Sequence, residues 1–453
     1  MYDILPLFQC LMFHLDPTTL RRMSLVMSAL FAMSGRITML GLSRWSGKGG
    51  SYRTIQRFFN TVMPWPTLMW EFFRSQCWRQ RDTYLLVGDE VVVSKAGKET
   101  YGLGRFFSSL SDQPVAGLAF FCLSLVSVEQ RQSHPVRLEQ VIRAADKTKK
   151  GGQRSSSKGA STSNPDAKSA PAKRKQGRPK GSKNKDKTDV CLNGELRMIK
   201  GAILALLSLI AGLLPIRYLV LDGHFGNNHA LQMARQCNLH LISKLRYDSQ
   251  LCTPYQGPSK HRKYGERLNP RQMPHSYRVA SSIEEGIRTD IYQLTALSSA
   301  FASPLNVVII LKTHLRTQQQ VHVILFTSDL DLAYDTLVDY YALRFQIEFN
   351  FRDAKQFWGL EDFMNTTERG VTNAANLSLF MVSVSHRLLQ DVRRDWPECS
   401  LLDLKAWFRG YVYVKEVLKF LPEKLDPILS ALIFAKVANL GAVHPIPASE
   451  TSL

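Results

Sequence analysis

A stretch of 43 residues near the middle of the chain cannot contribute to a hydrophobic core. Residues 147–189, KTKKGGQRSSSKGASTSNPDAKSAPAKRKQGRPKGSKNKDKTD, contain no Val, Ile, Leu, Met, Phe, Tyr or Trp. Such a segment cannot bury enough apolar surface to offset the entropy lost on folding, which predicts a disordered linker. Any core must therefore be assembled from the residues on both sides of it.

This linker also holds much of the positive charge. It contains fourteen Lys and Arg but only three Asp, so +11 of the formal charge of +20 lies within it. A polyanion is the expected partner, and nucleic acid and an acidic membrane surface both fit. The motif GRPKGSKNK resembles the AT-hook, an arm that binds a narrow DNA minor groove, which makes Arg178 and Lys180 candidate DNA contacts. A solvated basic loop is the alternative.

Length and cysteine content narrow the class of protein. A chain of 453 residues suggests two to four domains. Seven scattered cysteines without a CxxC pair argue for a reducing compartment and against a structural zinc site. The opening residues lack the basic leader of a secretory signal. The longest apolar run, residues 201–214, is shorter than the roughly 18 residues that span a bilayer, so we expect a buried helix.

Outside the linker, strand-like and helix-like segments alternate. Apolar, β-branched runs between residues 83 and 130 predict the beginning of a sheet. After the linker, the pattern predicts a helix, a strand, a helix and a strand at 193–214, 217–226, 227–237 and 239–246. This alternation is typical of an α/β fold. Further strand-like runs up to residue 330 predict a β-rich insertion, and helices are expected at both ends of the chain.

Two of the predicted strands end in an aspartate. TYLLVGDE ends with Asp89 and RYLVLDGH with Asp222. A strand that is apolar on both faces lies inside a covered sheet, and an acid at its end emerges at the rim, where ligands bind. A single strand-end Asp usually caps a turn. His224, two residues beyond Asp222, is a candidate metal ligand or a positioning residue.

A third acid lies on a predicted helix that begins near residue 334 and carries three distinct faces. At about 100° per residue, four residues share one polar face: Tyr341, Arg344, Glu348 and Lys355. An adjoining face is apolar and predicts core contacts for Leu343, Ile347, Phe351 and Ala354. The remaining face is expected in solvent, with Gln346, Asn350 and Asp353. The alternative for the first face is an ordinary salt bridge between Arg344 and Glu348.

Asp89, Asp222 and Glu348 suggest metal chemistry if they meet in space. Three carboxylates in one pocket repel one another unless a cation binds between them. Their hard oxygen ligands suit Mg²⁺ or Mn²⁺, and a pair of such ions can drive in-line attack on a phosphodiester. Arg344 and Lys355 would then contact phosphate, and Tyr341 would hydrogen-bond or stack at a DNA end.

The Tyr-x2-Arg-x3-Glu-x6-Lys spacing of Tyr341 to Lys355 resembles the signature of insertion-sequence-four-type DDE transposases, which move bacterial DNA. Asp89 and Asp222 resemble the first two acids of that family. The resemblance implies a ribonuclease H-like core, two Mg²⁺ or Mn²⁺ ions held by Asp89, Asp222 and Glu348, and cleavage at terminal inverted repeats through a hairpin intermediate, followed by joining to target DNA. Many relatives carry Asp-Thr where this chain has Asp89-Glu90, so Glu90 is an alternative acid.

The resemblance also implies double-stranded DNA as substrate, a homodimer that pairs two DNA ends, and the bacterial cytoplasm, with the nucleoid, as location. The expected fold is a ribonuclease H-like mixed sheet flanked by helices, with seven segments: a helical DNA-binding region (1–80), core parts 1 to 3 (81–146, 190–248, 334–395), the basic linker (147–189), a β-rich insertion (249–333) and a helical C-terminal region (396–453). The rival functions are a nuclease that cleaves without joining and a non-catalytic DNA-binding relic.

Overall fold

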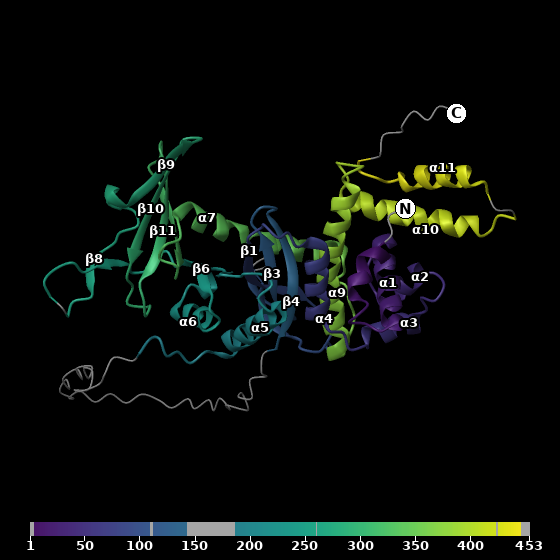
Figure 1. Ribbon diagram of the computed structural model, residues 1–453, viewed down its shortest axis with the longest axis horizontal. Helices are drawn as coiled ribbons and strands as arrows, with labels where there is room; N and C mark the ends of the chain where they lie inside the picture. The colour runs from purple at the N-terminus through teal and green to yellow at the C-terminus, as the bar shows by residue number, and fades with distance from the viewer. Residues whose placement is uncertain (1–3, 109–111, 143–185, 260, 423–424, 445–453) are drawn as a thin grey trace, which may run out of the picture.

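The computed structural model describes residues 4–108, 112–142, 186–259, 261–422 and 425–444. Arg178 and Lys180, the candidate DNA contacts of the linker, lie outside these ranges. The described chain forms an elongated molecule in which a large sheet occupies one end and the centre, and helices from both ends of the chain occupy the other end (Figure 1).

Ten strands form the main sheet, in the order β2-β3-β1-β5-β6-β12-β11-β10-β9, with β4 paired to β3. The first part of the chain provides β1 (Tyr84–Ser94), β2 (Gly104–Ser108), β3 (Gln113–Ser127) and β4 (Gln132–Val141). The region after the linker provides β5 (Tyr218–Val220), β6 (His240–Leu245), β9 (Arg278–Glu284), β10 (Ile287–Ala296), β11 (Leu305–His314) and β12 (Gln320–Thr327). The core is thus built from both sides of the linker.

The centre of the sheet is mixed in direction. β1 pairs antiparallel with β3 and parallel with β5, and β5 pairs parallel with β6. The expected alternation is present, with α5 (Gly194–Ile210) before β5 and α6 (Asn228–Gln236) before β6. The predicted strand 217–226 is shorter than expected, because the chain turns into a 3-10 helix, η3 (Gly223–Phe225), directly after Asp222.

The strands of residues 249–333 mostly extend this same sheet. β12 pairs antiparallel with β6, and β11, β10 and β9 follow outward from it. Within the described ranges, only β7 (Cys252–Pro254) and β8 (Tyr264–Arg267) form a separate two-stranded sheet. The segment is β-rich, as the sequence predicts, and it is continuous with the central strands through backbone hydrogen bonds.

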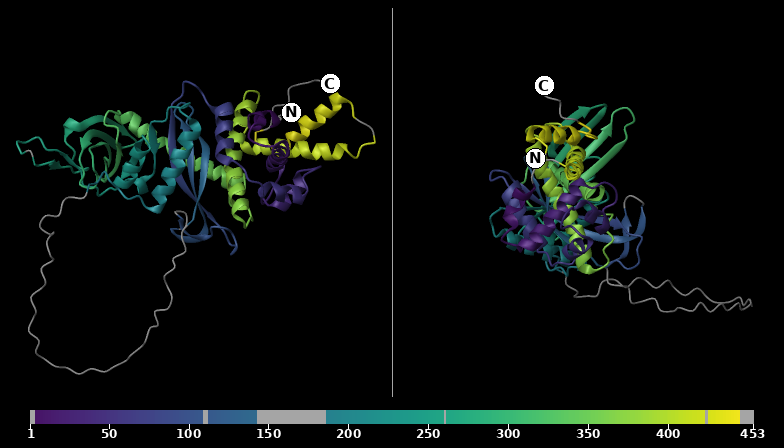
Figure 2. Two further views of the ribbon diagram at one scale, coloured as in Figure 1. Left: turned by 60° about the horizontal axis from the view of Figure 1, so that its bottom comes forward. Right: turned by 90° about the vertical axis from the view of Figure 1, so that its right-hand side faces the viewer.

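Helices from both ends of the chain pack together. The N-terminal group comprises η1 (Leu5–Leu11), α1 (Pro17–Ala32), α2 (Met39–Trp45), α3 (Tyr52–Phe59), α4 (Trp65–Phe72) and the π-helix η2 (Phe73–Cys77); the C-terminal group comprises α9 (Glu368–Val392), α10 (Leu401–Leu418) and α11 (Pro427–Ala438). Ser51 caps α3 by accepting the Thr54 N–H. Figures 1 and 2 show α9 between the sheet and helices α1 to α3.

Aromatic side chains connect these helices to the core. Phe31 of α1 packs edge-on against Trp358, with ring centroids 5.1 Å apart, and stacks on Phe408 of α10 at 4.8 Å. Trp358 follows α8, so a single cluster joins the N-terminal, central and C-terminal helices. The run 201–214 lies in and after α5, which buries only one side, and no helix in the described ranges has the length and apolarity needed to cross a membrane.

The helix expected from about residue 334 is in fact two. α7 (Tyr334–Leu343) ends before Arg344, and α8 (Gln346–Phe357) begins after Phe345. At this junction the backbone switches to tighter bonds between residues three apart, including Arg344 N–H to Tyr341 O at 3.2 Å and Phe345 N–H to Ala342 O at 3.1 Å. The single-helix prediction was wrong because neither Pro nor Gly marks the break.

The predicted apolar face of this region is buried, but the predicted solvent face is not in solvent. Asn350 is 1% exposed and Asp353 is 6% exposed. Asn350 Nδ2 donates to Ser133 Oγ of β4 at 2.7 Å, and Asp353 Oδ2 lies 3.3 Å from His386 Nε2 of α9. α8 is therefore enclosed by the sheet on one side and by α9 on the other, which periodicity alone could not reveal.

Candidate functional site

The register of the central strands brings Asp89 and Asp222 to the same level. Leu86 of β1 is paired with Leu219 of β5, and Val87 with Val220. Each aspartate follows its paired valine by two residues, and neighbouring strands lie about 4.8 Å apart. Side chains two residues apart project to the same face, so both carboxyl groups belong to one edge of the sheet. Asp222 also caps η3, where its Oδ1 accepts the His224 N–H at 3.2 Å.

Arg344 connects this edge to the third predicted acid. Its Nη1 lies 2.7 Å from Asp89 Oδ2, and its Nη2 lies 2.9 Å from Glu348 Oε1. The salt bridge between Arg344 and Glu348 is thus present, and it is one half of a larger contact. The α7–α8 junction presents the guanidinium to β1, so that acids 259 positions apart in the sequence share one cation.

The charges of these residues influence one another. Burial raises the pKa of Asp89 to about 6; the Arg344 guanidinium opposes this, whereas the carboxylates of Asp222 and Glu348 raise it further. Burial also raises the pKa of the Tyr341 phenol, with Arg344 opposing and Asp222 contributing to the increase. Five of the predicted site residues are therefore close enough to affect one another's pKa or charge: Asp89, Asp222, Tyr341, Arg344 and Glu348.

Lys355 lies at the same edge but contacts protein groups. Its Nζ donates to the Val92 carbonyl at 2.9 Å, three positions beyond Asp89 in β1. The same atom lies 2.9 Å from Glu361 Oε1. Lys355 therefore ties α8 to β1 and to the segment that follows α8, and its charge is already balanced by a carboxylate.

The donor atoms at this edge fit a hard divalent cation. All three acids offer carboxylate oxygens, which Mg²⁺ and Mn²⁺ prefer. The Arg344 guanidinium already brings positive charge to two of them. Within the ranges that the structure describes, no three His, Cys, Asp or Glu side chains are grouped closely enough to hold an ion as they stand. Holding one jointly would require the three carboxylates to come closer together and Arg344 to move off Asp89 and Glu348.

Glu90 and His224, the alternative acid and the candidate metal ligand, point away from the three predicted acids. Glu90 adjoins Asp89 in β1, so its Cβ projects to the opposite face of the strand, while its N–H donates to Asp89 Oδ1 at 2.8 Å. His224 Nε2 lies 3.6 Å from Glu195 Oε1 of α5, and its ring packs edge-on against Phe225 at 4.9 Å.

Sequence reasoning missed Lys244, which shares the level of the two aspartates. Val220 of β5 is paired with Ile242 of β6, so Lys244 stands beside Asp222. The neighbouring Ser243 Oγ donates to the Asp222 carbonyl at 2.6 Å. The signal was the lysine in the short strand HLISKL, two positions beyond the last residue paired with β5. It can be interpreted only when the register of β5 and β6 is known.

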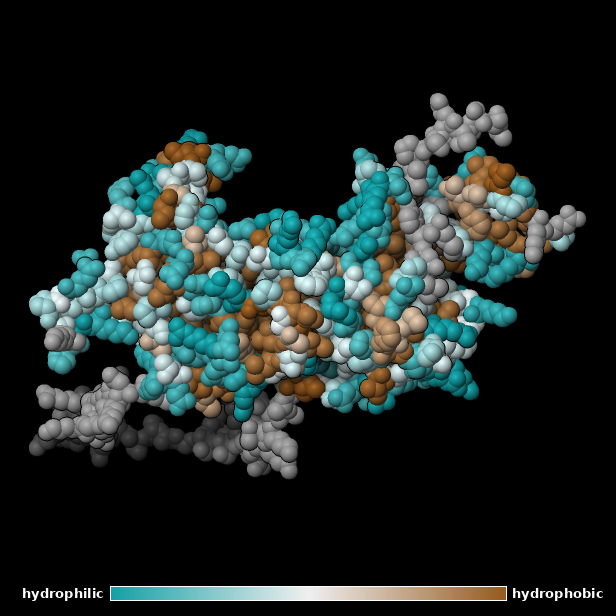
Figure 3. Space-filling view, in the orientation of Figure 1, coloured by the Kyte–Doolittle hydropathy of each residue, from teal (hydrophilic) through white to brown (hydrophobic). Residues whose placement is uncertain are grey.

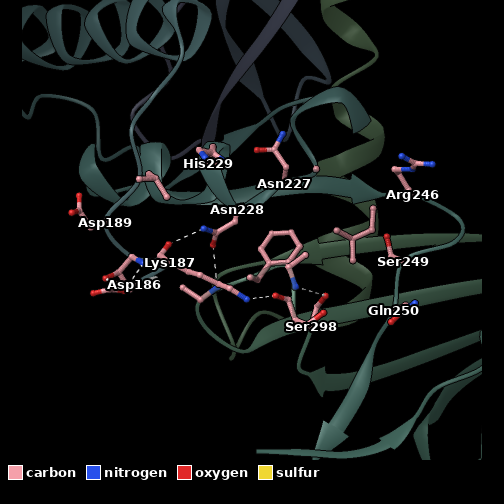
Figure 4. A pocket seen from close by; sticks show the side chains of 18 of the residues that line it. Asp186, Lys187, Asp189, Asn227, Asn228, His229, Arg246, Ser249, Gln250 and Ser298 are labelled. Atoms are coloured by element: carbon pink, nitrogen blue, oxygen red, sulfur yellow. Dashed lines mark hydrogen bonds between the residues drawn. The ribbon is translucent and has the colours of Figure 1, made fainter. Parts of the chain in front are cut away.

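A cavity of about 1440 Å³ opens beyond the end of β6 (Figure 4). Its floor is organised by the buried Asn228, whose Nδ2 donates to the Lys187 carbonyl at 2.8 Å and whose Oδ1 accepts the Ala302 N–H at 3.0 Å. None of the predicted catalytic residues lines it. The cavity therefore adjoins the acidic edge without containing the carboxylates.

Comparison with known families identifies the class of this chain. The family model described as "DDE superfamily endonuclease" matches residues 6–301, which is more than half of the chain. The matched range includes Asp89 and Asp222 and ends before Glu348. No curated protein matches the chain in sequence.

Proposed function

Because the chain belongs to the DDE superfamily endonuclease family, we propose that it is a DNA transposase, which cuts double-stranded DNA at the ends of a mobile element and joins those ends to a target. The observation that carries this proposal is the contact of Arg344 with both Asp89 and Glu348, next to Asp222 in register. This contact joins Asp89 to Glu348 through Arg344, and Arg344 and Glu348 both belong to the Tyr-x2-Arg-x3-Glu-x6-Lys pattern.

In this proposal Asp89, Asp222 and Glu348 would hold two Mg²⁺ or Mn²⁺ ions. When bound, such ions activate the attacking hydroxyl group and stabilise the leaving oxygen. Arg344 presents a planar fork suited to two phosphate oxygens. Tyr341 lies beside Arg344 and can hydrogen-bond at the DNA end, and Lys355 adds a point charge near β1. These groups bind and orient the strand for in-line attack.

Two further observations support the assignment to a ribonuclease H-like transposase of the insertion-sequence-four type. The central strands run β4-β3-β1-β5-β6, with β1, β5 and β6 parallel, and this order supports a ribonuclease H-like core. The spacing of Tyr341, Arg344, Glu348 and Lys355 supports the insertion-sequence-four type. We propose further that a homodimer pairs the two element ends in the bacterial cytoplasm, and that Arg178 and Lys180 of the linker contact the minor groove.

The test uses linear DNA that carries the ends of the chain's own element, a target plasmid and Mg²⁺. We expect cleavage and joining by the natural protein, and loss of both in Asp89→Ala, Asp222→Ala and Glu348→Ala. Glu284→Ala, which removes an exposed acid from β9 of the same sheet, is the matched control and should retain activity.

Other results of this experiment would favour one of the two rival functions or refute the site. Cleavage without joining would indicate a nuclease, and DNA binding without cleavage would indicate a relic. Full activity in the three acid variants would refute the site.

A further inference from the structure

Lys244 extends the row of residues at the acidic edge onto a third parallel strand. Asp89 of β1 and Lys244 of β6 each lie two residues beyond the residue paired with Val220, and Asp222 lies two residues beyond Val220 itself, just after β5. The Lys244 side chain runs beside Gly223, where an added Cβ would lie 3.2 Å from the lysine Cε. Gly223 directly follows Asp222, so its missing side chain leaves space for the ammonium group next to the second acid.

A second glycine fixes this arrangement. A Cβ on Gly226 would lie 2.1 Å from the Lys244 carbonyl oxygen, so only glycine lets the η3 segment approach β6 this closely. Together with the bond from Ser243 Oγ to the Asp222 carbonyl, this contact holds the Asp222 turn against β6. The separation of Lys244 from Asp222 is therefore set by backbone packing.

The cations of this edge differ in what they contact. Arg344 is engaged by Asp89 and Glu348, and Lys355 by Glu361 and a carbonyl. The Lys244 side chain is exposed, and its ammonium group makes no hydrogen bond or ion pair with another described residue, whereas its backbone pairs with Leu325 of β12. A polyanion that approaches three carboxylates is repelled by them, and an unpaired ammonium group beside them lowers that repulsion.

We propose that Lys244 binds a phosphate oxygen of the DNA strand at the cleavage site and sets the position of that strand over Asp222. This inference rests on the proposed function, since it takes the acidic edge as the place of cleavage. The ammonium group acts as a point charge on the backbone and reads no base.

The first test measures DNA binding without metal, over a series of salt concentrations, with linear duplex DNA that carries the element ends. Each phosphate contact contributes about 0.9 to the slope of log affinity against log salt. Lys244→Gln should lower that slope by about one contact, whereas Lys244→Arg should keep it. Lys312→Gln is the matched control, because Lys312 is an exposed lysine on β11 of the same sheet, and it should leave the slope unchanged.

The second test measures cleavage with Mg²⁺. We expect Lys244→Gln to cut about ten- to a hundredfold more slowly, as for loss of one hydrogen bond to a charged group, and Lys244→Arg to recover most of the rate. A structural role would instead lower the melting temperature of Lys244→Gln and leave the salt slope as it is.

The two proposals fail in different ways. Equal salt slopes for Lys244→Gln and Lys312→Gln would overturn the role of Lys244 even if the natural protein cleaves and joins DNA. A lower slope in Lys244→Gln together with a natural protein that does not cleave would support the phosphate contact and reject the transposase.

Discussion

The two ends of the main sheet are covered very differently. Residues 117–127 of β3, next to β1, are all buried, whereas β9 at the far end is exposed along nearly its whole length. Apolar side chains reach the surface on the strands beyond β6, including Ile283 of β9 at 63% exposure and Val321 of β12 at 67%. Figure 3 shows brown, apolar atoms at the surface in this part of the molecule. Asp89 lies on the buried strand β1 and Asp222 directly follows the buried strand β5, so packing of the sheet fixes the backbone on which both acids stand.

The largest contrast in stability should come from an aromatic residue at the covered end. Phe121 of β3 is 2% exposed and lies against Phe225, which follows Asp222. Phe121→Ala should lower the free energy of unfolding by about 3–5 kcal/mol, because it leaves a cavity. Val321→Ala, at an exposed position of β12, should change it by less than about 0.5 kcal/mol. Urea unfolding measures both, and similar losses would contradict the difference in covering.

A second prediction uses the buried carboxyl group itself. The folded chain holds a proton on Asp89 with a pKa of about 6, above the usual value near 4 in an unfolded chain. The folded state therefore binds more protons between these values, and the free energy of unfolding falls as the pH rises from about 4 to about 6. In metal-free protein this loss should reach roughly 2–3 kcal/mol and disappear in Asp89→Asn. Glu284→Gln, which changes an exposed acid of β9, is the control and should keep the pH profile of the natural protein. If Asp89→Asn also kept that profile, the raised pKa of Asp89 would be contradicted.

A third prediction concerns the space behind Asp89. A Cβ on Gly88 would lie 2.7 Å from Phe121 Cζ and 2.8 Å from Leu221 Cδ2. Gly88→Ala should cost about 1–3 kcal/mol through overpacking and should slow cleavage, since Leu221 precedes Asp222. Gly201 of α5 has no atom within 4 Å of an added Cβ, so Gly201→Ala should stabilise the fold by about 0.5–1 kcal/mol. If the melting temperatures of Gly88→Ala and Gly201→Ala changed in the same direction, this prediction would be wrong.

The smallest change in the free energy of unfolding is expected from a surface ion pair that joins two parts of the core. Arg131, between β3 and β4, lies 2.8 Å from Asp339 of α7, and the two side chains are 52% and 39% exposed. Asp339→Asn should cost about 0–1 kcal/mol, and less at high salt. A double-mutant cycle with Arg131→Gln measures the pair directly, and a coupling above about 2 kcal/mol would show that it fixes α7.

The sequence allowed the prediction of those features that depend on local pattern. The apolar runs ending in Asp89 and Asp222 and the helices around β5 follow from spacing and residue type. The break at Arg344 and Phe345, the burial of Asn350 and Asp353, and the alignment of Lys244 with Asp222 depend on contacts between distant segments. Helical periodicity could group Arg344 with Glu348, but no local signal reports the contact with Asp89.

Under the proposed function, the shared contact of Arg344 would make the entry of a metal ion an exchange reaction. A guanidinium that already neutralises Asp89 and Glu348 must leave before an ion can take both carboxylates, and a DNA phosphate is a natural acceptor for it. Metal and DNA then strengthen each other's binding, by reciprocal linkage. Titration of Mn²⁺ should show tighter binding when duplex DNA is present, and equal affinities would contradict this coupling. If the proposed function holds, such a site would be completed only when metal and DNA are both bound.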